Sequence, residues 1–342
     1  MTGVRTAVVG ATGAVGRTMI AILEERVFPV SELRLLASER SAGSKVETAW
    51  GEVEVEDLAT ADPSGIEVAL FSAGGDRSRA HAPRFAEAGA VVVDNSSAFR
   101  MEPDVPLVVA QVNDHAVIRR PRGIVANPNC TTMDLMMAVG PLHRGAGVRS
   151  MIATSYQSVS GSGQRGMEEL ERQTRFFLDA TEALRVGGWD DPLPQVYARP
   201  IGFNVIPFAG SEKEHRYTDE EWKLVYESRK ILEVPGLWVE PTCVRVPVMV
   251  GHGIAATLRF DRPVGREEAL DLLTAAPGVQ VWEDTVPTPL DSAGIDDVLV
   301  GRVRETLGEP GGINLWVVGD NLRKGAALNA VQIAELVVAE RS

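Results

Sequence analysis

Cys130 is the residue that the sequence places best for nucleophilic chemistry. It follows Asn127, Pro128 and Asn129, and a helical pattern of apolar residues begins soon after it. Pro128 restricts the turn, and the Asn129 side chain can cap the first amides of the helix. At a helix N-terminus, unpaired N–H groups and the helix dipole favour the reactive thiolate. The alternative is a small buried cysteine, a common environment for this residue, and this stretch alone leaves both open.

A histidine between two glycines is the second candidate. His252 lies between Gly251 and Gly253, and it is one of five histidines in the chain. The glycines would let its ring lie against another chain segment without crowding. Imidazole is the usual general acid or base near neutral pH. A single histidine is more often structural or exposed, so the sequence alone does not assign this role.

Four charged residues are candidates for binding an anionic substrate. Arg100 follows a predicted strand end, and Arg245 shares one face of a strand-like segment with Cys243. Glu220 and Lys223 share one face of a helix that a capping box at residues 218–221 predicts to begin there. The alternatives are a solvated surface arginine for Arg100 and a surface ion pair for Glu220 and Lys223.

A glycine turn near the N-terminus predicts a dinucleotide site. The apolar run at residues 6–9 leads into Gly10, Gly13 and Gly16, and a helical pattern follows. Gly10 and Gly13 would let the backbone approach a pyrophosphate at the helix N-terminus, and Gly16 would allow close helix–strand packing. The alternative is a tight turn without a ligand, but a strand before the turn and a helix after it favour dinucleotide binding.

The end of the second strand indicates which dinucleotide binds. Residues 33–37 read as a strand, after which Arg40 lies in the segment Ser38-Glu39-Arg40-Ser41. NAD enzymes usually carry an acid here for the ribose 2′-OH, whereas an arginine suits the 2′-phosphate of NADP. Glu39 could point away from this phosphate or repel it, and the alternative for the whole segment is a polar loop without a ligand. We therefore expect NADP rather than NAD.

The remaining pattern predicts two domains of different class. Strand-like segments at residues 67–71, 90–94, 107–110 and 123–126, with a helix at 77–88, predict a doubly wound parallel sheet. Ligands bind beyond the carboxyl ends of such strands, where the glycine turn, Asn95 and Cys130 are expected. Segments at 150–159, 253–260, 279–282 and 313–318 predict a half-buried sheet, antiparallel over its last three segments. Helical patterns at 167–184 and 218–231 complete an α+β second domain, and the chain ends in an amphipathic helical pattern at 325–339.

Composition narrows the class of protein. A chain of 342 residues is too long for one ordinary core, and 44% hydrophobic with 24% charged residues is typical of a soluble globular protein. The net charge of -13 argues against nucleic-acid binding. Two cysteines provide no disulfide framework, which suits a reducing cytosol. We expect no membrane span, no secretory leader and no metal ligands, and hence a cytoplasmic protein.

Eight stretches together resemble the bacterial aspartate-semialdehyde dehydrogenases. They fall in the family's order and extend over nearly the whole chain, so the combination is specific although each piece is weaker. The matching stretches are GATGAVG at 10–16, DNSSAFR at 94–100, NPNCTT at 127–132, SYQSVSGSG at 155–163, ESRKIL at 227–232, CVRVPV at 243–248, GHG at 251–253 and GDNLRKGAALN at 319–329.

The resemblance implies an activity and a role for each matching residue. The family reduces L-aspartyl 4-phosphate with NADPH to L-aspartate 4-semialdehyde and phosphate, a step toward lysine, diaminopimelate, methionine, threonine and isoleucine. By resemblance, Cys130 forms the acyl thioester, His252 is the acid/base and Gln157 orients the substrate. Arg245 binds the substrate carboxylate, Arg100 and Lys223 bind phosphate, and Glu220 contacts the amino group. The matching NADP contacts are Gly10, Thr12, Gly13, Ala14, Val15, Arg40, Ser41, Ala42, Ser160, Gly161 and Asn321.

The resemblance also implies a domain organisation and an oligomeric state, and two alternative functions remain open. It implies an NADP-binding Rossmann-like domain at 1–128, completed by a C-terminal helix at 322–342, a catalytic and dimerisation domain at 129–321, and a homodimer or tetramer. One departure is Gln111, where relatives commonly carry an acid. The rivals are N-acetyl-glutamyl-phosphate reductase, which shares the thioester chemistry, and a non-catalytic NADP-binding regulator.

Overall fold

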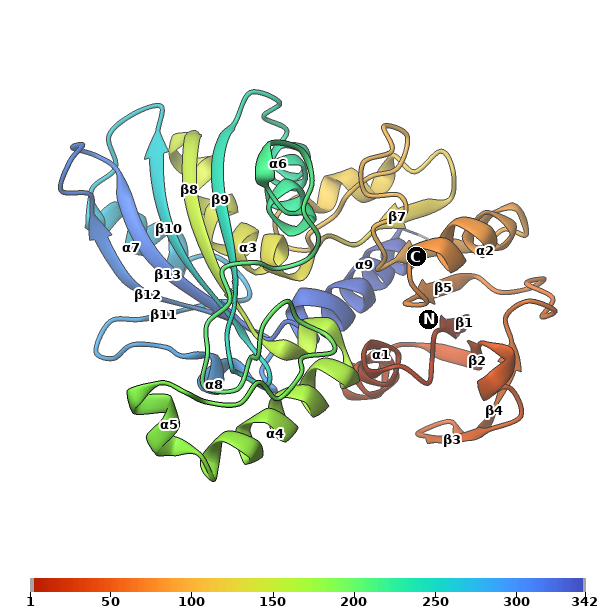
Figure 1. Ribbon diagram of the computed structural model, residues 1–342. Helices are drawn as coiled ribbons and strands as arrows, with labels where there is room; N and C mark the ends of the chain where they lie inside the picture. The colour runs from red at the N-terminus through yellow and green to blue at the C-terminus, as the bar shows by residue number, and fades with distance from the viewer. Residues whose placement is uncertain (1–2, 341–342) are drawn as a thin grey trace. The chain divides into compact units, whose positions relative to one another are not determined.

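The computed structural model describes residues 3–340, and its helices and strands are labelled in Figure 1. These residues form two compact units. Unit 1 contains the residues up to 136, Lys230–Val234 and the residues from 322 onward, and unit 2 contains Met137–Arg229 and Pro235–Asn321. Within residues 3–340, no helix has both the length and the apolar character needed to cross a membrane.

The sheet of unit 1 is built mainly from short apolar runs. Its seven strands lie in the order β3-β4-β2-β1-β5-β6-β7, and every neighbouring pair except β3 and β4 is parallel. This confirms the predicted Rossmann-like, doubly wound sheet. The strands are β1 (Val4–Val9), β2 (Val30–Ala37), β3 (Lys45–Thr48), β4 (Gly51–Asp57), β5 (Val68–Phe71), β6 (Val91–Asp94) and β7 (Ile124–Ala126).

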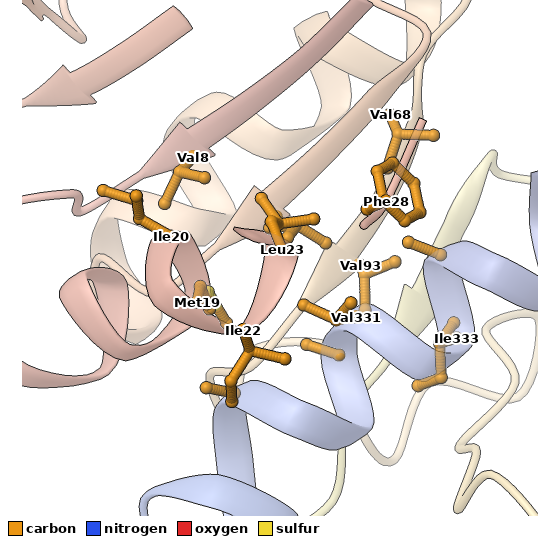
Figure 2. Packing of buried hydrophobic residues seen from close by; sticks show 14 of the residues in the cluster. Val8, Met19, Ile20, Ile22, Leu23, Phe28, Val68, Val93, Val331 and Ile333 are labelled. Carbon is orange, nitrogen blue, oxygen red and sulfur yellow. The ribbon is translucent and has the colours of Figure 1, made fainter. Parts of the chain in front are cut away.

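Two helices from opposite ends of the chain share the core on one face of this sheet. Figure 2 shows Leu23 of α1 (Ala14–Glu25) and Val331 of α9 (Leu328–Ala339) in the same apolar cluster as Val93 of β6. Strands and helices both contribute fully buried side chains there. The C-terminal helix therefore returns to the first domain, as predicted.

The opposite face of the same sheet is covered by α2 (Gly75–Glu87). Leu70 of β5 belongs to the cluster shared with α1 and α9. Side chains alternate along a strand, so Phe71 points the other way. There its ring meets the ring of Phe85 of α2 edge-on, with centroids 5.1 Å apart. Cover on both faces explains why the central strands are apolar throughout.

One predicted strand of unit 1 is wrong, and one strand pair was missed. Residues 107–110 form only an isolated bridge from Leu107 to Ala126. The next amides bond to side chains instead, that of Val109 to Asn113 and that of Ala110 to Asn329. The missed pair is β3 with β4. These strands contain many charged residues and few apolar ones, so the apolar–polar alternation that predicts a strand is weak there.

Unit 2 has one six-stranded sheet in the order β11-β12-β13-β10-β8-β9. β10 pairs antiparallel with β8 and β13, as the sequence predicts for a half-buried sheet. The predicted antiparallel pairing of residues 279–282 is wrong, because β11 joins β12 in parallel through a crossover that carries α8. The strands are β8 (Val148–Gln157), β9 (Trp238–Arg245), β10 (His252–Phe260), β11 (Val279–Trp282), β12 (Val298–Glu305) and β13 (Ile313–Gly319).

Two helices of unit 2, α4 and α5, were predicted from the sequence as a single helix. Residues 167–184 were expected to be one helix, but α4 ends at Leu178 and α5 begins at Thr181. Ala180 leaves helical geometry with φ −127°, which breaks the segment. The helices are α3 (Cys130–Ala146), which begins in unit 1, α4 (Gln164–Leu178), α5 (Thr181–Val186), α6 (Asp219–Ile231), which ends in unit 1, α7 (Arg266–Thr274) and α8 (Pro289–Ser292).

Truncating a buried side chain of α9 tests whether this helix completes unit 1. Ile333 is fully buried in the cluster of Figure 2, so Ile333→Ala should lower the free energy of unfolding by about 2–5 kcal/mol. The matched control is Ile118→Ala, because Ile118 is 71% exposed and should change stability by less than about 0.5 kcal/mol. Urea unfolding followed by circular dichroism measures both. Equal stability of the two variants would contradict the packing described.

Candidate active site

Cys130 is the first residue of α3, directly after a turn that follows β7. The Asn129 Oδ1 accepts hydrogen bonds from the amides of Thr131 at 3.0 Å and Thr132 at 3.4 Å. This confirms the predicted cap. The Cys130 side chain is partly exposed, whereas the residues on either side of it are buried. The thiol therefore lies at the positive end of a capped helix, where a thiolate is favoured.

Buried amides hold the turn that precedes Cys130. The Asn127 Nδ2 donates to Asn95 Oδ1 at 2.6 Å and to the carbonyl of Ala326 at 3.0 Å. Its Oδ1 accepts from Asn329 Nδ2 at 2.6 Å. Asn127 and Asn329 are both fully buried. Each amide is therefore satisfied by protein groups, which gives the turn one well-defined conformation.

Arg100 is part of the same buried frame. Its Nε donates to the carbonyl of Asn127 at 2.9 Å, and its Nη2 donates to the carbonyl of Asn95 at 3.0 Å. The loop that carries it is held by Lys230, whose Nζ donates to the carbonyls of Arg100, Glu102 and Val105 at 2.7 Å each. Arg100 is buried, so the alternative of a solvated surface arginine is wrong.

The glycine turn between β1 and α1 requires glycine for steric reasons. Gly10 has φ +87°, and a Cβ there would lie 2.3 Å from the Ser72 carbonyl oxygen. A Cβ on Gly16 would lie 2.2 Å from the Gly10 oxygen. Gly13 is the N-cap of α1 and provides no side-chain cap to the helix amides. The open helix N-terminus is the kind of site that binds a pyrophosphate.

The loop after β2 lies beside this turn. The Thr12 hydroxyl donates to Ser41 Oγ at 3.3 Å, which joins the turn to the short 3₁₀ helix Glu39–Ser41. Arg40 is exposed in that helix, as is Glu39. Ala14 and Val15 begin α1 close to the turn, and Ala42 closes the loop. An exposed arginine among hydroxyl groups beside the turn fits the 2′-phosphate of NADP.

His252 is buried at the first position of β10. Its Nδ1 accepts a hydrogen bond from the amide of Ser158 at 3.0 Å and contacts the Ser158 hydroxyl at 3.1 Å. A Cβ on Gly253 would lie 2.4 Å from the ring of Trp316, so glycine is needed beside the histidine. Burial, with the charge of Arg245 nearby, lowers the pKa of His252 to about 3. The imidazole is therefore neutral at physiological pH.

Arg245 and Gln157 lie side by side at the ends of β9 and β8, where the parallel register pairs them. Both are buried. The Arg245 Nη1 donates to the Ser158 carbonyl at 2.7 Å, and the Gln157 Nε2 donates to Ser155 Oγ at 3.2 Å. Cys243 is on the same face of β9 as Arg245, as predicted, but burial raises the pKa of its thiol to about 12. Cys243 is thus a poor nucleophile.

Asn321 organises the loop beside His252. The Asn321 Oδ1 accepts hydrogen bonds from the hydroxyls of Ser158 and Ser160 at 3.0 Å and from the amide of Gly251 at 2.9 Å. A Cβ on Gly161 would lie 3.1 Å from Arg245 Nη1 and 3.5 Å from the His252 ring. Ser160, Gly161 and Asn321 are therefore brought together with Arg245 and His252 within unit 2.

Glu220 and Lys223 form a partly buried ion pair on α6. The Lys223 Nζ donates to Glu220 Oε1 at 2.6 Å and to Asp219 Oδ2 at 2.8 Å. Burial opposes the charge, but the two carboxylates outweigh it and raise the pKa of Lys223 to about 12. The predicted capping box is confirmed by bonds between Thr218 and Glu221, and Glu221 also accepts from the Cys243 amide at 3.0 Å. This helix start is therefore attached to β9.

The amide at position 111 has a buried cation as its partner. The Gln111 Oε1 accepts from Lys324 Nζ at 3.1 Å, and Lys324 is 1% exposed. The same ammonium donates to Gln332 Oε1 at 2.7 Å. A glutamine therefore provides a neutral acceptor where the resemblance leads one to expect a carboxylate.

Sequence reasoning missed three residues that support the site. Ser158 lies within a matching stretch but has no conspicuous spacing, and Tyr197 lies in an irregular segment. Asn329 had a usable signal, because it is a polar residue among Leu328, Ala330 and Val331 in an otherwise apolar helix. A buried asparagine in such a helix must find hydrogen-bond partners.

Family models cover both units. One described as semialdehyde dehydrogenase, NAD binding domain matches residues 5–119, and one described as semialdehyde dehydrogenase, dimerisation domain matches residues 139–324. The aspartate-semialdehyde dehydrogenase of Streptomyces akiyoshiensis is 54% identical over 340 residues, which is 98% of this chain and 99% of that protein. The chain belongs to the aspartate-semialdehyde dehydrogenase family.

Solved structures of aspartate-semialdehyde dehydrogenases have the same fold. The Vibrio cholerae enzyme II complexed with ASA is 44% identical, covers 99% of each chain and has a TM-score of 0.94. The Candida albicans enzyme with NADP is 25% identical, also covers 99% of each chain and has a TM-score of 0.75. The fold is thus retained among aspartate-semialdehyde dehydrogenases of quite different sequence.

The buried histidine predicts a pH dependence of stability. The His252 pKa is about 3 when folded and near 6.5 when unfolded, so only the unfolded chain binds this proton between those values. Its contribution to stability is complete above about pH 6.5 and falls as pH decreases, by up to about 1.4 kcal/mol per pH unit. His252→Asn should therefore make urea stability vary less between pH 7.5 and 5.

His215→Asn is the matched control, because His215 is an exposed histidine of unit 2 and should keep the wild-type slope. Tryptophan fluorescence is a suitable probe, since Trp50 lies in unit 1 and the other tryptophans lie in unit 2. An unchanged slope in His252→Asn would show that the ring is not held neutral.

Proposed function

We propose that this chain catalyses the NADPH-dependent reductive dephosphorylation of L-aspartyl 4-phosphate to L-aspartate 4-semialdehyde and phosphate. The observation that carries the proposal is Cys130 at the capped start of α3, in a turn held by buried amides and Arg100. Family membership supports the same substrate. The product would enter lysine, diaminopimelate, methionine, threonine and isoleucine synthesis. Neither cysteine is in a disulfide, which suits a cytoplasmic enzyme.

NADP(H) is the proposed cofactor, and the residues of unit 1 fit it. The first amides of α1, those of Ala14 and Val15, would hold the pyrophosphate, while Arg40 and Ser41 would hold the 2′-phosphate. The first turn of α1 carries no acidic side chain that would repel it. When bound, NADPH supplies the hydride that reduces the acyl group. Ser160, Gly161 and Asn321 of unit 2 are proposed as further contacts.

Cys130 is the proposed nucleophile. Its thiolate attacks the acyl carbon, the bond from that carbon to the phosphate oxygen breaks, and phosphate leaves with the electron pair. Arg100 and Lys223 are proposed to bind the phosphate, for which cationic donors are suited. After reduction of the thioester, the carbon–sulfur bond breaks, the aldehyde is released and the Cys130 thiolate is restored.

The substrate contacts are proposed from unit 2. Arg245 suits the substrate carboxylate because a guanidinium can bind both of its oxygens. Gln157, the register neighbour of Arg245, would orient the acyl group, and Glu220 would bind the amino group. His252 is proposed as the acid/base. The neutral ring is the form that would accept the thiol proton, and the carboxylate of a bound substrate would offset the Arg245 charge that disfavours the protonated ring. The protonated ring would later protonate the oxygen of the tetrahedral species.

A homodimer is the proposed assembly. The family model over unit 2 is named for dimerisation, and one sheet face of this unit carries exposed apolar side chains. Ile152 is 39% exposed, Tyr156 36% and Trp238 46%, and the register of β8 and β9 puts all three on the same face. The Tyr156 ring also contacts Trp316, with centroids 5.6 Å apart. Exposed aromatic and aliphatic side chains gathered on one sheet face are typical of a protein–protein interface, and a tetramer would need a second one.

The reverse reaction tests the proposed function. Wild type given aspartate semialdehyde, NADP and phosphate should form NADPH, and omission of phosphate should abolish turnover. Cys130→Ala should reduce kcat by at least about 10³-fold, because the covalent step is lost. The matched control is Cys243→Ala, which removes the unreactive buried thiol and should stay within about threefold of wild type.

The same assay distinguishes the rivals. Turnover of N-acetyl-glutamate semialdehyde in place of aspartate semialdehyde would assign the chain to N-acetyl-glutamyl-phosphate reductase chemistry. NADP binding without phosphate-dependent turnover of either aldehyde would indicate a non-catalytic regulator. Either result would contradict the proposal.

A further inference from the structure

A long irregular segment of unit 2 is held against the end of β9. We define the strap as residues 187–213, between α5 and the short turn Glu214–Arg216; it is the irregular green loop between α5 and α6 in Figure 1. Long loops without secondary structure are uncommon in compact domains and are usually functional or disordered. The contacts of this one show that it is built into the unit.

Two buried side chains of α4 fasten the strap by its backbone. The Glu169 Oε2 accepts hydrogen bonds from the amides of Gln195 at 2.8 Å and Val196 at 2.9 Å. One turn further along α4, the Gln173 Oε1 accepts from the amide of Ile201 at 2.7 Å. Glu169 is 3% exposed and Gln173 is fully buried. A buried carboxylate is costly unless it is bonded, so these bonds make the position of the strap strongly preferred.

The strap in turn surrounds Arg245. Ile206 exchanges both backbone hydrogen bonds with Arg245, at 2.9 Å and 2.8 Å. The Arg245 guanidinium lies over the ring of Tyr197, with its central carbon 5.7 Å from the ring centroid. The Tyr197 hydroxyl donates to the Val159 carbonyl at 3.3 Å, which anchors the far end of the ring. Tyr197, whose ring faces this cation, therefore directly follows Gln195 and Val196, the two residues whose amides Glu169 binds.

The guanidinium lacks the carboxylate that such a buried cation normally has. Among the residues that the structure describes, no acidic side chain forms an ion pair with Arg245, and its buried Nε has no acceptor. The positive charge of Arg245 is instead stabilised by the Ser158 carbonyl and the face of the Tyr197 ring. An aromatic face attracts a cation and fixes the plane of a guanidinium without competing for its in-plane donors. Apart from the Nη1 bond to Ser158, the in-plane donors of Arg245 are therefore left without an acidic partner among the described residues.

We propose that Tyr197 is a positioning residue for Arg245 and thereby sets the affinity for the substrate carboxylate. This rests on the proposed function, in which Arg245 binds that carboxylate. The strap, fastened by Glu169 and Gln173, holds the ring in place, and the ring holds the plane of the guanidinium. Tyr197 touches no reacting atom in this account, so its removal should weaken substrate binding more than the chemical step.

Steady-state kinetics of the reverse reaction test this role. Tyr197→Leu should raise the KM for aspartate semialdehyde by about five- to tenfold, the loss expected for a buried cation–π contact. The KM values for NADP and phosphate, and kcat, should stay within about twofold. Tyr197→Phe keeps the ring and should keep the wild-type KM for the semialdehyde. Phe208→Leu is the matched control, because Phe208 is an aromatic residue of the same strap packed on the same apolar cluster.

The outcomes separate this inference from the proposed function. A wild-type KM for the semialdehyde in Tyr197→Leu, or an equal rise in Phe208→Leu, would overturn the positioning role while wild-type turnover still supports the function. Wild-type protein without phosphate-dependent turnover would refute both. If Tyr197→Leu does not fold, Glu169→Gln provides the same test by weakening the bonds to the strap amides. It should raise the same KM selectively, and an unchanged KM would contradict the proposal.

Discussion

The buried amide of Asn127 is the contact on which the position of Cys130, the proposed nucleophile, depends. Its side chain joins the end of β6 through Asn95 to the C-terminal segment through Asn329, and its carbonyl accepts from Arg100. A helix dipole favours a thiolate only within the first turn, so the turn before α3 must be fixed to have this effect. Satisfied amides in a low-dielectric interior hold such a turn better than apolar packing, which is not directional.

Differences in burial give side chains of the same chemical type different ionisation behaviour. Cys130 is partly exposed at a helix N-terminus, whereas Cys243 is buried in β9, where its pKa is raised to about 12. His252 is buried next to a cation and is neutral, whereas His215 is exposed to solvent. The surroundings therefore give the two members of each pair different properties.

Local sequence patterns predicted the parts of the site that depend on neighbours in the chain. The glycine turn, the Asn129 cap and the capping box at Thr218 are interactions over a few residues, and all three are present. Alternating apolar runs likewise predicted the doubly wound sheet. The strand expected at residues 107–110 failed because its amides bond to Asn113 and Asn329, which no local pattern reveals.

The remaining parts depend on contacts between distant residues. Ser158 meets His252, Asn127 meets Asn329, and Tyr197 meets Arg245, each across a long stretch of chain. Single-residue propensities contain no information on such pairs, and spacing in the sequence does not reveal them. The resemblance is the basis for the proposed reacting residues, and the structure shows which groups hold them.

The proposed chemistry depends on Cys130 as the carrier of the acyl group. The most direct test is mass spectrometry of protein incubated with aspartate semialdehyde and NADP without phosphate and then quenched in acid. We expect one added aspartyl group on the peptide that contains Cys130, and this adduct should disappear when phosphate is added before the quench. Absence of the adduct under conditions that support turnover with phosphate, or an adduct on Cys243, would contradict it.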